Sequence, residues 1–201
     1  MRPSRSPLNQ IIGATILLVV AGVLFFPAYL YWNGSIRHSI TALARCGAAP
    51  RYETSDQTGR PIGSAELSGI IWVAGFVNFS RPDEAELLCG KFAELDQNFR
   101  GVQGLTLVSF FIGAEKNALK DYAQRYEASD HWHLVLIPEG ASGLVQDWAS
   151  ATAGCRGRIG AENLFVLIDR QGKIRNAYDA TAPETVQKLL IDVGNLLRAE
   201  R

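Results

Sequence analysis

Residues 69–95 constrain the fold more than any other part of this 201-residue chain. Residues 70–79 form an almost unbroken apolar run, which is too short to cross a membrane and is typical of a strand buried on both faces of a sheet. Pro82 then suits the first position of a helix, because its missing N–H costs nothing there. Apolar residues follow at helical spacing: Leu87, Leu88, Phe92 and Leu95. The stretch predicts a central strand, a tight turn and an amphipathic helix.

The turn between this strand and helix is where many α/β folds carry their chemistry. Here it reads Ser80-Arg81-Pro82 and offers no obvious nucleophile and no metal ligand. The rest of the sequence lacks the common catalytic motifs, namely a Ser-His-Asp triad pattern, a glycine-rich phosphate loop and a His-Glu-x-x-His zinc motif. A peroxiredoxin interpretation also fails, because Arg81 stands where the reactive cysteine of such an enzyme belongs. The sequence therefore predicts no catalytic residue and a protein that is not an enzyme.

Shorter segments predict the rest of one α/β domain. A polar, glycine-containing turn at 56–59 predicts a hairpin within 51–62. Helical periodicity marks 115–126 and 142–152, and Thr181 is expected to cap a final helix. The further strands are predicted at 105–111, 133–137, 164–168 and 174–178. Strand, helix, strand, helix, strand, then a hairpin and a last helix, is the order of a thioredoxin-like fold.

The N-terminal part of the chain predicts a membrane anchor. Residues 11–31 are apolar and uncharged, and about 20 residues of helix span about 30 Å of hydrocarbon. A cleaved signal peptide is the alternative, but its apolar core usually has only about 7–15 residues. We therefore expect a tail at 1–10, a transmembrane helix at 11–32, a linker at 33–50 and the thioredoxin-like domain at 51–201. The lipid bilayer is the first predicted partner, and the short tail favours a domain outside the cytoplasm.

The charge distribution argues against a nucleic-acid surface. The formal net charge is zero, yet no acidic residue precedes Glu53, so the body of the chain is mildly acidic. The basic N-terminal section is simply explained as membrane-flanking charge.

Four segments of the chain resemble the Sco (SenC) family of membrane-anchored, thioredoxin-like proteins, which assist copper insertion into cytochrome c oxidase. They read WVAGFVNFSRPDEAELLCGKFAEL, LTLVSFF, LKDYAQRYEASDHWHLV and FVLIDRQGKIRNAYDATAPETVQKLL. The resemblance covers roughly residues 51–198, and the predicted anchor matches as well. It implies a thioredoxin-like fold of Sco type.

The functional motif of that family is missing from this chain. The resemblance places the two family cysteines at Arg81 and Ala85, and the family histidine at Ala161 or its neighbours Gly160 and Glu162. Copper(I) needs soft thiolate and imidazole donors, and an arginine in the pocket would repel it. We therefore expect neither metal nor cofactor at the usual site.

Three cysteines remain to be explained: Cys46, Cys89 and Cys155. They are too few for a disulfide framework, although an exported domain can use one pair as a staple. The resemblance places Cys155 in the loop that approaches the turn after the central strand, which makes a Cys89–Cys155 disulfide conceivable. Cys46–Cys155 is the rival pairing. A rearranged copper or thiol site at Cys89 and Cys155, with His133, is the alternative to a structural role.

Two functions from different classes follow. The leading hypothesis is a non-catalytic assembly factor or accessory subunit of a membrane respiratory complex, with cytochrome c oxidase chosen by analogy. The alternative is a copper- or thiol-handling protein that uses the rearranged site. A plain thiol-disulfide enzyme is a weaker third, because no closely spaced cysteine pair exists. In each case the domain is expected on the periplasmic or intermembrane-space side.

Overall fold

The computed structural model of the chain describes residues 46–137, 142–155, 157, 159–160 and 163–199. The predicted tail and transmembrane helix, and the linker up to residue 45, lie outside the described residues. Within the described ranges, no helix is long and apolar enough to cross a membrane.

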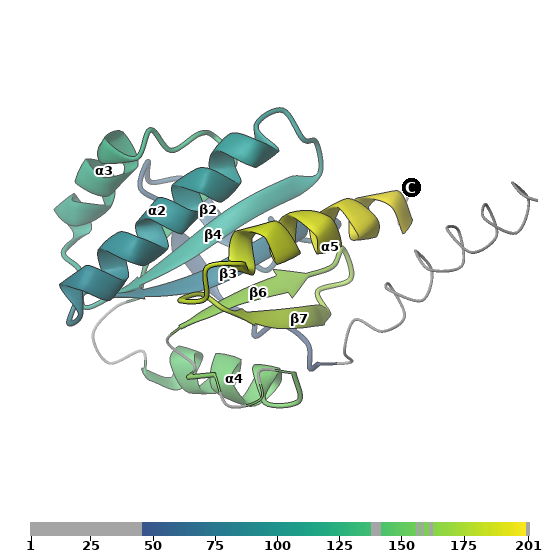
Figure 1. The fold of residues 1–201 in the computed structure, drawn as a ribbon. Coiled ribbons are helices and arrows are strands. Elements are labelled where there is room, and N and C mark those ends of the chain that lie inside the picture. The colour runs from purple at the N-terminus through teal and green to yellow at the C-terminus, as the bar shows by residue number, and fades with distance from the viewer. Residues whose placement is uncertain (1–45, 138–141, 156, 158, 161–162, 200–201) are drawn as a thin grey trace, which may run out of the picture. The chain divides into compact units, whose positions relative to one another are not determined.

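A five-stranded sheet with the order β5-β4-β3-β6-β7 forms the centre of the domain (Figure 1). Strands β3, β4 and β5 are parallel, whereas β6 runs antiparallel to β3 and β7 antiparallel to β6. A separate hairpin, β1 and β2, is linked to β5 by one isolated bridge between Asp56 and Val135. The strands are β1 Glu53–Ser55, β2 Pro61–Gly63, β3 Ile71–Asn78, β4 Leu105–Ile112, β5 Trp132–Ile137, β6 Leu164–Ile168 and β7 Ile174–Asp179.

Helices cover both faces of this sheet (Figure 1). They are α2 Pro82–Phe99, α3 Lys116–Arg125, α4 Ser142–Thr152 and α5 Thr185–Ala199. Helices α2, α3 and α5 bury their apolar side chains in one cluster, which we call the α2-side core. Helix α4 and the β1–β2 hairpin pack on the opposite face, in the α4-side core.

The position of strand β3 in the sheet explains why its sequence is without polar side chains up to its last residue, Asn78. Ile71 and Val73 belong to the α2-side core, whereas Trp72 and Ala74 belong to the α4-side core. Successive side chains of a strand point to opposite faces, so a central strand covered on both sides has no exposed face. At Gly75, a Cβ atom would lie 2.6 Å from Cζ of Phe92 on α2 and also within 3.0 Å of the Phe165 ring.

The predicted strands and helices occur close to their expected bounds, and the thioredoxin-like order is confirmed. The prediction that Thr181 caps the last helix is wrong, because α5 begins at Thr185. Thr181 instead donates from its N–H and hydroxyl to the Asp179 carboxylate, at 2.8 and 2.6 Å. The Asp179 side chain thus closes a turn at the end of β7 and delays the start of the helix.

Candidate functional site

The turn after β3 is the position at which the resemblance places the chemistry of the Sco family. Its backbone is held by a hydrogen bond from the N–H of Arg81 to the carbonyl of Asn78, at 3.1 Å. The Arg81 guanidinium is half-exposed and lies 3.2 Å from the Glu84 carboxylate. The methyl group of Ala85 is buried in the α2-side core. The first family position therefore carries a fixed cation at the surface, and the second carries a packed methyl group.

This donor set does not fit copper(I). Arg81 and Ala85 provide neither a thiolate nor an imidazole, and the guanidinium adds repulsion between like charges. Ala161, the third family position, lies outside the described residues. Across the part of the chain that the structure describes, no three or more His, Cys, Asp or Glu side chains are grouped to hold a metal ion.

Cys89 lies on the inner face of α2 and is completely buried. Burial, helped by the nearby Glu86 carboxylate and partly offset by Arg125, raises the pKa of its thiol to about 12. Only the thiolate acts as a nucleophile or a metal ligand. Cys89 is therefore a neutral, packed thiol at physiological pH.

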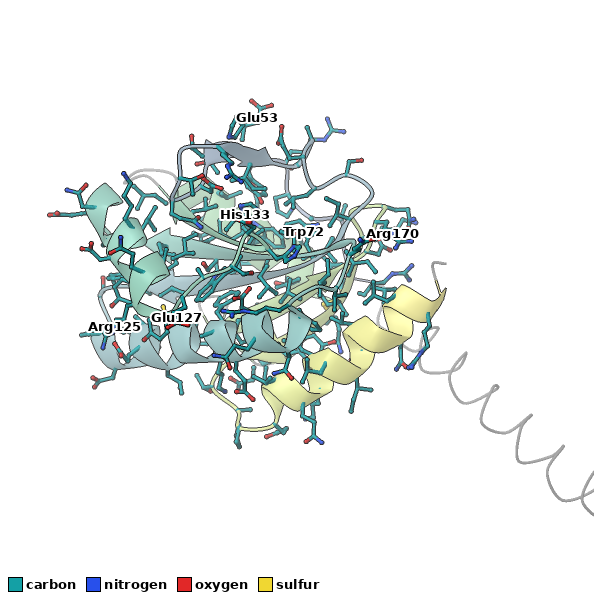
Figure 2. The ribbon with its side chains drawn as sticks, turned by 90° about the horizontal axis from the view of Figure 1, so that it is seen from above. Glu53, Trp72, Arg125, Glu127, His133 and Arg170 are labelled. Atoms are coloured by element: carbon teal, nitrogen blue, oxygen red, sulfur yellow. A yellow bond between two sulfur atoms is a disulfide. The ribbon has the colours of Figure 1, made fainter. Side chains whose placement is uncertain are left out.

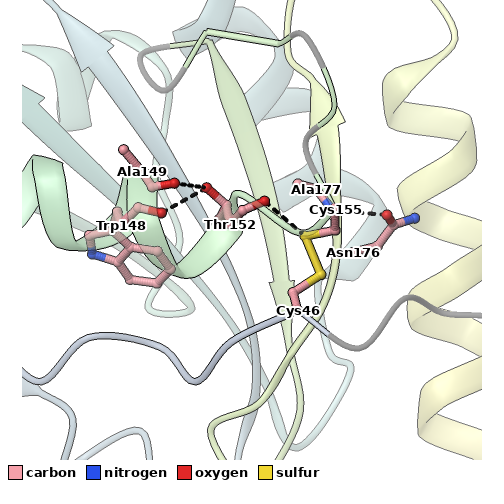
Figure 3. The surroundings of a disulfide bond; sticks show 7 residues. All are labelled: Cys46, Trp148, Ala149, Thr152, Cys155, Asn176 and Ala177. Carbon is pink, nitrogen blue, oxygen red and sulfur yellow. Dashed lines mark hydrogen bonds between the residues drawn. A yellow bond between two sulfur atoms is a disulfide. The ribbon is translucent and has the colours of Figure 1, made fainter.

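Cys155 is bonded to Cys46, with a Cα–Cα distance of 5.6 Å (Figure 3). The predicted Cys89–Cys155 disulfide is therefore wrong, and the rival pairing is the one observed. The reason is the sheet itself. Cys89 lies in the α2-side core, whereas Cys46 and Cys155 pack against the α4-side core.

His133 lies in the edge strand β5, beneath the hairpin that carries Glu53 (Figure 2). Its Nδ1 is 2.9 Å from Oδ2 of Asp56, a buried carboxylate that also accepts bonds from the N–H and hydroxyl of Thr58. Burial pushes the pKa of Asp56 upward, but the hydrogen bonds from Thr58, His133 and Arg60 outweigh it and the pKa falls below its ordinary value. His133 thus fastens the hairpin to the sheet.

The three residues of the predicted rearranged site do not come together. Cys89 is separated from the other two by the sheet. His133 lies on edge strand β5, whereas Cys155 follows α4, which packs against the opposite edge strand β7. The structure gives no support to copper or thiol chemistry shared by Cys89, Cys155 and His133.

The side chain of Gln57 makes a contact that sequence reasoning missed. Its Oε1 accepts the Leu134 N–H at 2.8 Å, and its Nε2 donates to the Trp132 carbonyl at 3.1 Å. The amide therefore replaces a peptide group on the open edge of β5. Edge strands with unpaired backbone groups recruit other chains, and covering them prevents this. The predicted turn at 56–59 places Gln57 in a loop, but nothing in the local sequence indicates that its amide bonds to Trp132 and Leu134.

Comparisons with known proteins identify the fold. No protein-family model matches the sequence, and no match is found among curated proteins. Among solved structures, a SCO1/SenC family lipoprotein from Bacillus anthracis str. Ames matches with a TM-score of 0.63 and 18% identity, covering 76% of this chain and 96% of that one. BsSco, described as a member of the Sco family of cytochrome c oxidase assembly proteins, matches at 0.61 with 16% identity, covering 76% and 95%. A thiol:disulfide interchange protein from Chlorobium tepidum TLS matches at 0.58 with 17% identity, covering 77% and 98%.

The domain is therefore a thioredoxin-like α/β domain. Its structural neighbours include Sco/SenC family proteins and thioredoxin-family proteins. Likeness at such low identity establishes the architecture, and function has to be argued from the residues of this chain.

Proposed function

We propose that this protein is a membrane-anchored, Sco-like assembly factor or accessory subunit of a membrane respiratory complex, without the metal or redox site that the Sco family carries after the central strand. The observation that carries the proposal is the turn after β3. Arg81 at the surface and Ala85 in the core leave it without a copper(I) donor or a reactive thiol. The remaining free thiol in the described residues, that of Cys89, is buried.

The intact framework around this turn supports a binding role. Both cores are closely packed, and the edge of β5 is covered by the Gln57 amide. Since the described residues around this turn offer neither an exposed thiol nor a copper donor, we infer that the domain acts through the surfaces it presents to a partner. Cytochrome c oxidase is the proposed partner by analogy, because BsSco belongs to a family of oxidase assembly proteins.

The proposed location is the periplasmic or intermembrane-space side of the membrane. The apolar segment at 11–31 supports a single-span anchor. The Cys46–Cys155 disulfide supports an oxidising compartment, since such bonds are rare where thioredoxin and glutathione keep thiols reduced.

Co-purification tests this proposal. The full-length protein, tagged at its C-terminus, is extracted from native membranes in a mild detergent, and associated proteins are quantified by mass spectrometry. A fusion of residues 1–45 to an unrelated soluble protein controls for binding by the anchor segment alone.

We expect subunits of one respiratory complex to be recovered in stoichiometric amounts with the full chain and not with the fusion. The double variant Arg81→Ser/Ala85→Ser should recover the same complex, if the turn contributes no chemistry to a redox or metal step. Recovery of the protein alone with bound copper would refute the proposal.

A further inference from the structure

The segment at 46–50 is docked on the domain by backbone hydrogen bonds. The N–H of Gly47 donates to the carbonyl of Ala151 at the end of α4, at 2.9 Å. The Gly47 carbonyl accepts from Ile174 at 3.0 Å, and Ala49 donates to Gly172 at 2.9 Å. A Cβ atom at position 47 would lie 2.9 Å from the Ala151 oxygen, so this close approach requires glycine. The segment thus bridges α4 and the turn between β6 and β7.

The disulfide fixes this segment at its N-terminal end (Figure 3). It joins positions 109 residues apart in sequence, and both cysteines are half-buried rather than enclosed in the core. Cys46 directly precedes Gly47, so the bond is the covalent link between the docked segment and the residues that follow α4. Whatever opens the disulfide therefore changes how the N-terminal part of the chain is attached.

The surroundings of Cys155 suit a reduced thiol as well as a disulfide. Its Sγ lies 3.4 Å from the carbonyl oxygen of Thr152. A disulfide sulfur carries no hydrogen, whereas a thiol is a weak donor, so reduction gives Cys155 a hydrogen-bond partner in place. Cys89 cannot capture either sulfur, because it is buried on the other face of the sheet.

We propose that Cys46–Cys155 is a redox latch that sets the length of the tether between the N-terminal segment and the domain. In the oxidised state the tether ends at Cys46. In the reduced state residues 46–51 detach, and the first residue held by the core is the buried Tyr52. Six added residues extend the reach by about 20 Å. Reading this tether as a link to the membrane rests on the proposed function.

The reductant is an external dithiol protein or small molecule. Its thiolate attacks one sulfur of the disulfide and forms a mixed disulfide, which its second thiolate then resolves. Two electrons and two protons pass to Cys46 and Cys155, which become thiols, while the dithiol becomes a disulfide.

Hydrogen exchange and alkylation of the full-length protein in detergent test the latch. Dithiothreitol is added under native conditions, and the Cys89→Ala variant, which keeps the disulfide, serves as the matched control. We expect Cys46 and Cys155 to be alkylated while Cys89 in the wild type stays protected. The amides of Gly47 and Ala49 should exchange roughly tenfold faster or more, with Val73 unchanged. The variant Cys46→Ser/Cys155→Ser should show the same exchange without reductant.

Two results would overturn the latch. Alkylation of Cys46 and Cys155 only together with Cys89 would show that the bond opens by global unfolding and is a structural staple. Reduction without faster exchange at Gly47 and Ala49 would show that the segment stays docked. Neither result depends on co-purification of a respiratory complex, so failure of the latch and failure of the proposed function are told apart.

Discussion

The packing of α2 against β3 makes a prediction whose size follows from the structure. In Gly75→Ala the new methyl group would lie 2.6 Å from Cζ of Phe92 and 2.8 and 2.9 Å from the Phe165 ring. Both rings are completely buried and pack edge to face at 4.8 Å, and Phe92 also stacks on Trp132 at 5.5 Å. Neither ring can turn away without disturbing another. Overpacking of a core costs about 1–3 kcal/mol, and three contacts this short place the substitution near 3 kcal/mol.

The prediction is measured by thermal and urea unfolding. For a domain of this size about 3 kcal/mol corresponds to a fall in Tm of roughly 6–12 °C. The matched control is Gly90→Ala, on the exposed face of α2, where a Cβ atom meets nothing within 4 Å. Because alanine is the better helix former, this control should stabilise the protein by up to about 1 kcal/mol. A Gly75→Ala protein as stable as the wild type would refute the packing described here.

Three further predictions concern Cys89, Asp56 and Gln57. Because the pKa of the Cys89 thiol is raised to about 12, the native protein with its disulfide intact holds very little Cys89 thiolate at pH 8. Cys89 should therefore be alkylated on the order of a thousandfold more slowly than a free cysteine, and fast labelling would contradict its burial. The ionised Asp56 carboxylate stabilises the folded protein above its unfolded pKa of about 4, and this stabilisation is lost as the pH falls through its lower folded pKa. Asp56→Asn should therefore flatten the loss of stability between about pH 5 and 3, measured by urea unfolding at each pH. An unchanged pH profile would count against this role of Asp56. Gln57→Ala should lower the free energy of unfolding by about 1 kcal/mol, measured by urea unfolding, because two hydrogen bonds to β5 are lost. It should also increase concentration-dependent association, measured by light scattering, because the edge of β5 is left open. A monomer of unchanged stability would show that the Gln57 amide is not needed at this edge.

Sequence periodicity was sufficient for the fold. The run at 70–79 has apolar residues on both faces because β3 is covered on both, and Pro82 marks the start of α2 because its ring suits the first helical position. The predicted start of the last helix, at Thr181, differs from the observed start at Thr185. Threonine is a common capping residue, but Thr181 donates instead to the Asp179 carboxylate, and only the folded turn brings the two side chains together.

The candidate site was less predictable. The resemblance places the two family cysteines at Arg81 and Ala85, and both lie where β3 leads into α2. The disulfide depends on which face of the sheet each cysteine occupies. Three cysteines allow three pairings, and spacing alone does not choose among them. The Asp56–His133 pair and the Gln57 amide are contacts between a hairpin tip and an edge strand more than 70 residues away, where no local pattern applies.

The central claim, that the domain acts without metal, is tested most directly by anaerobic titration of the full-length protein with copper(I) against a competing chelator. Arg81→Cys/Ala85→Cys, which places one thiol at the turn after β3 and one in the first turn of α2, serves as the positive control. The account predicts that the chelator keeps all the copper in the presence of the wild-type protein with its Cys46–Cys155 disulfide intact. Stoichiometric copper uptake by the wild type that is lost in Cys89→Ala would contradict it.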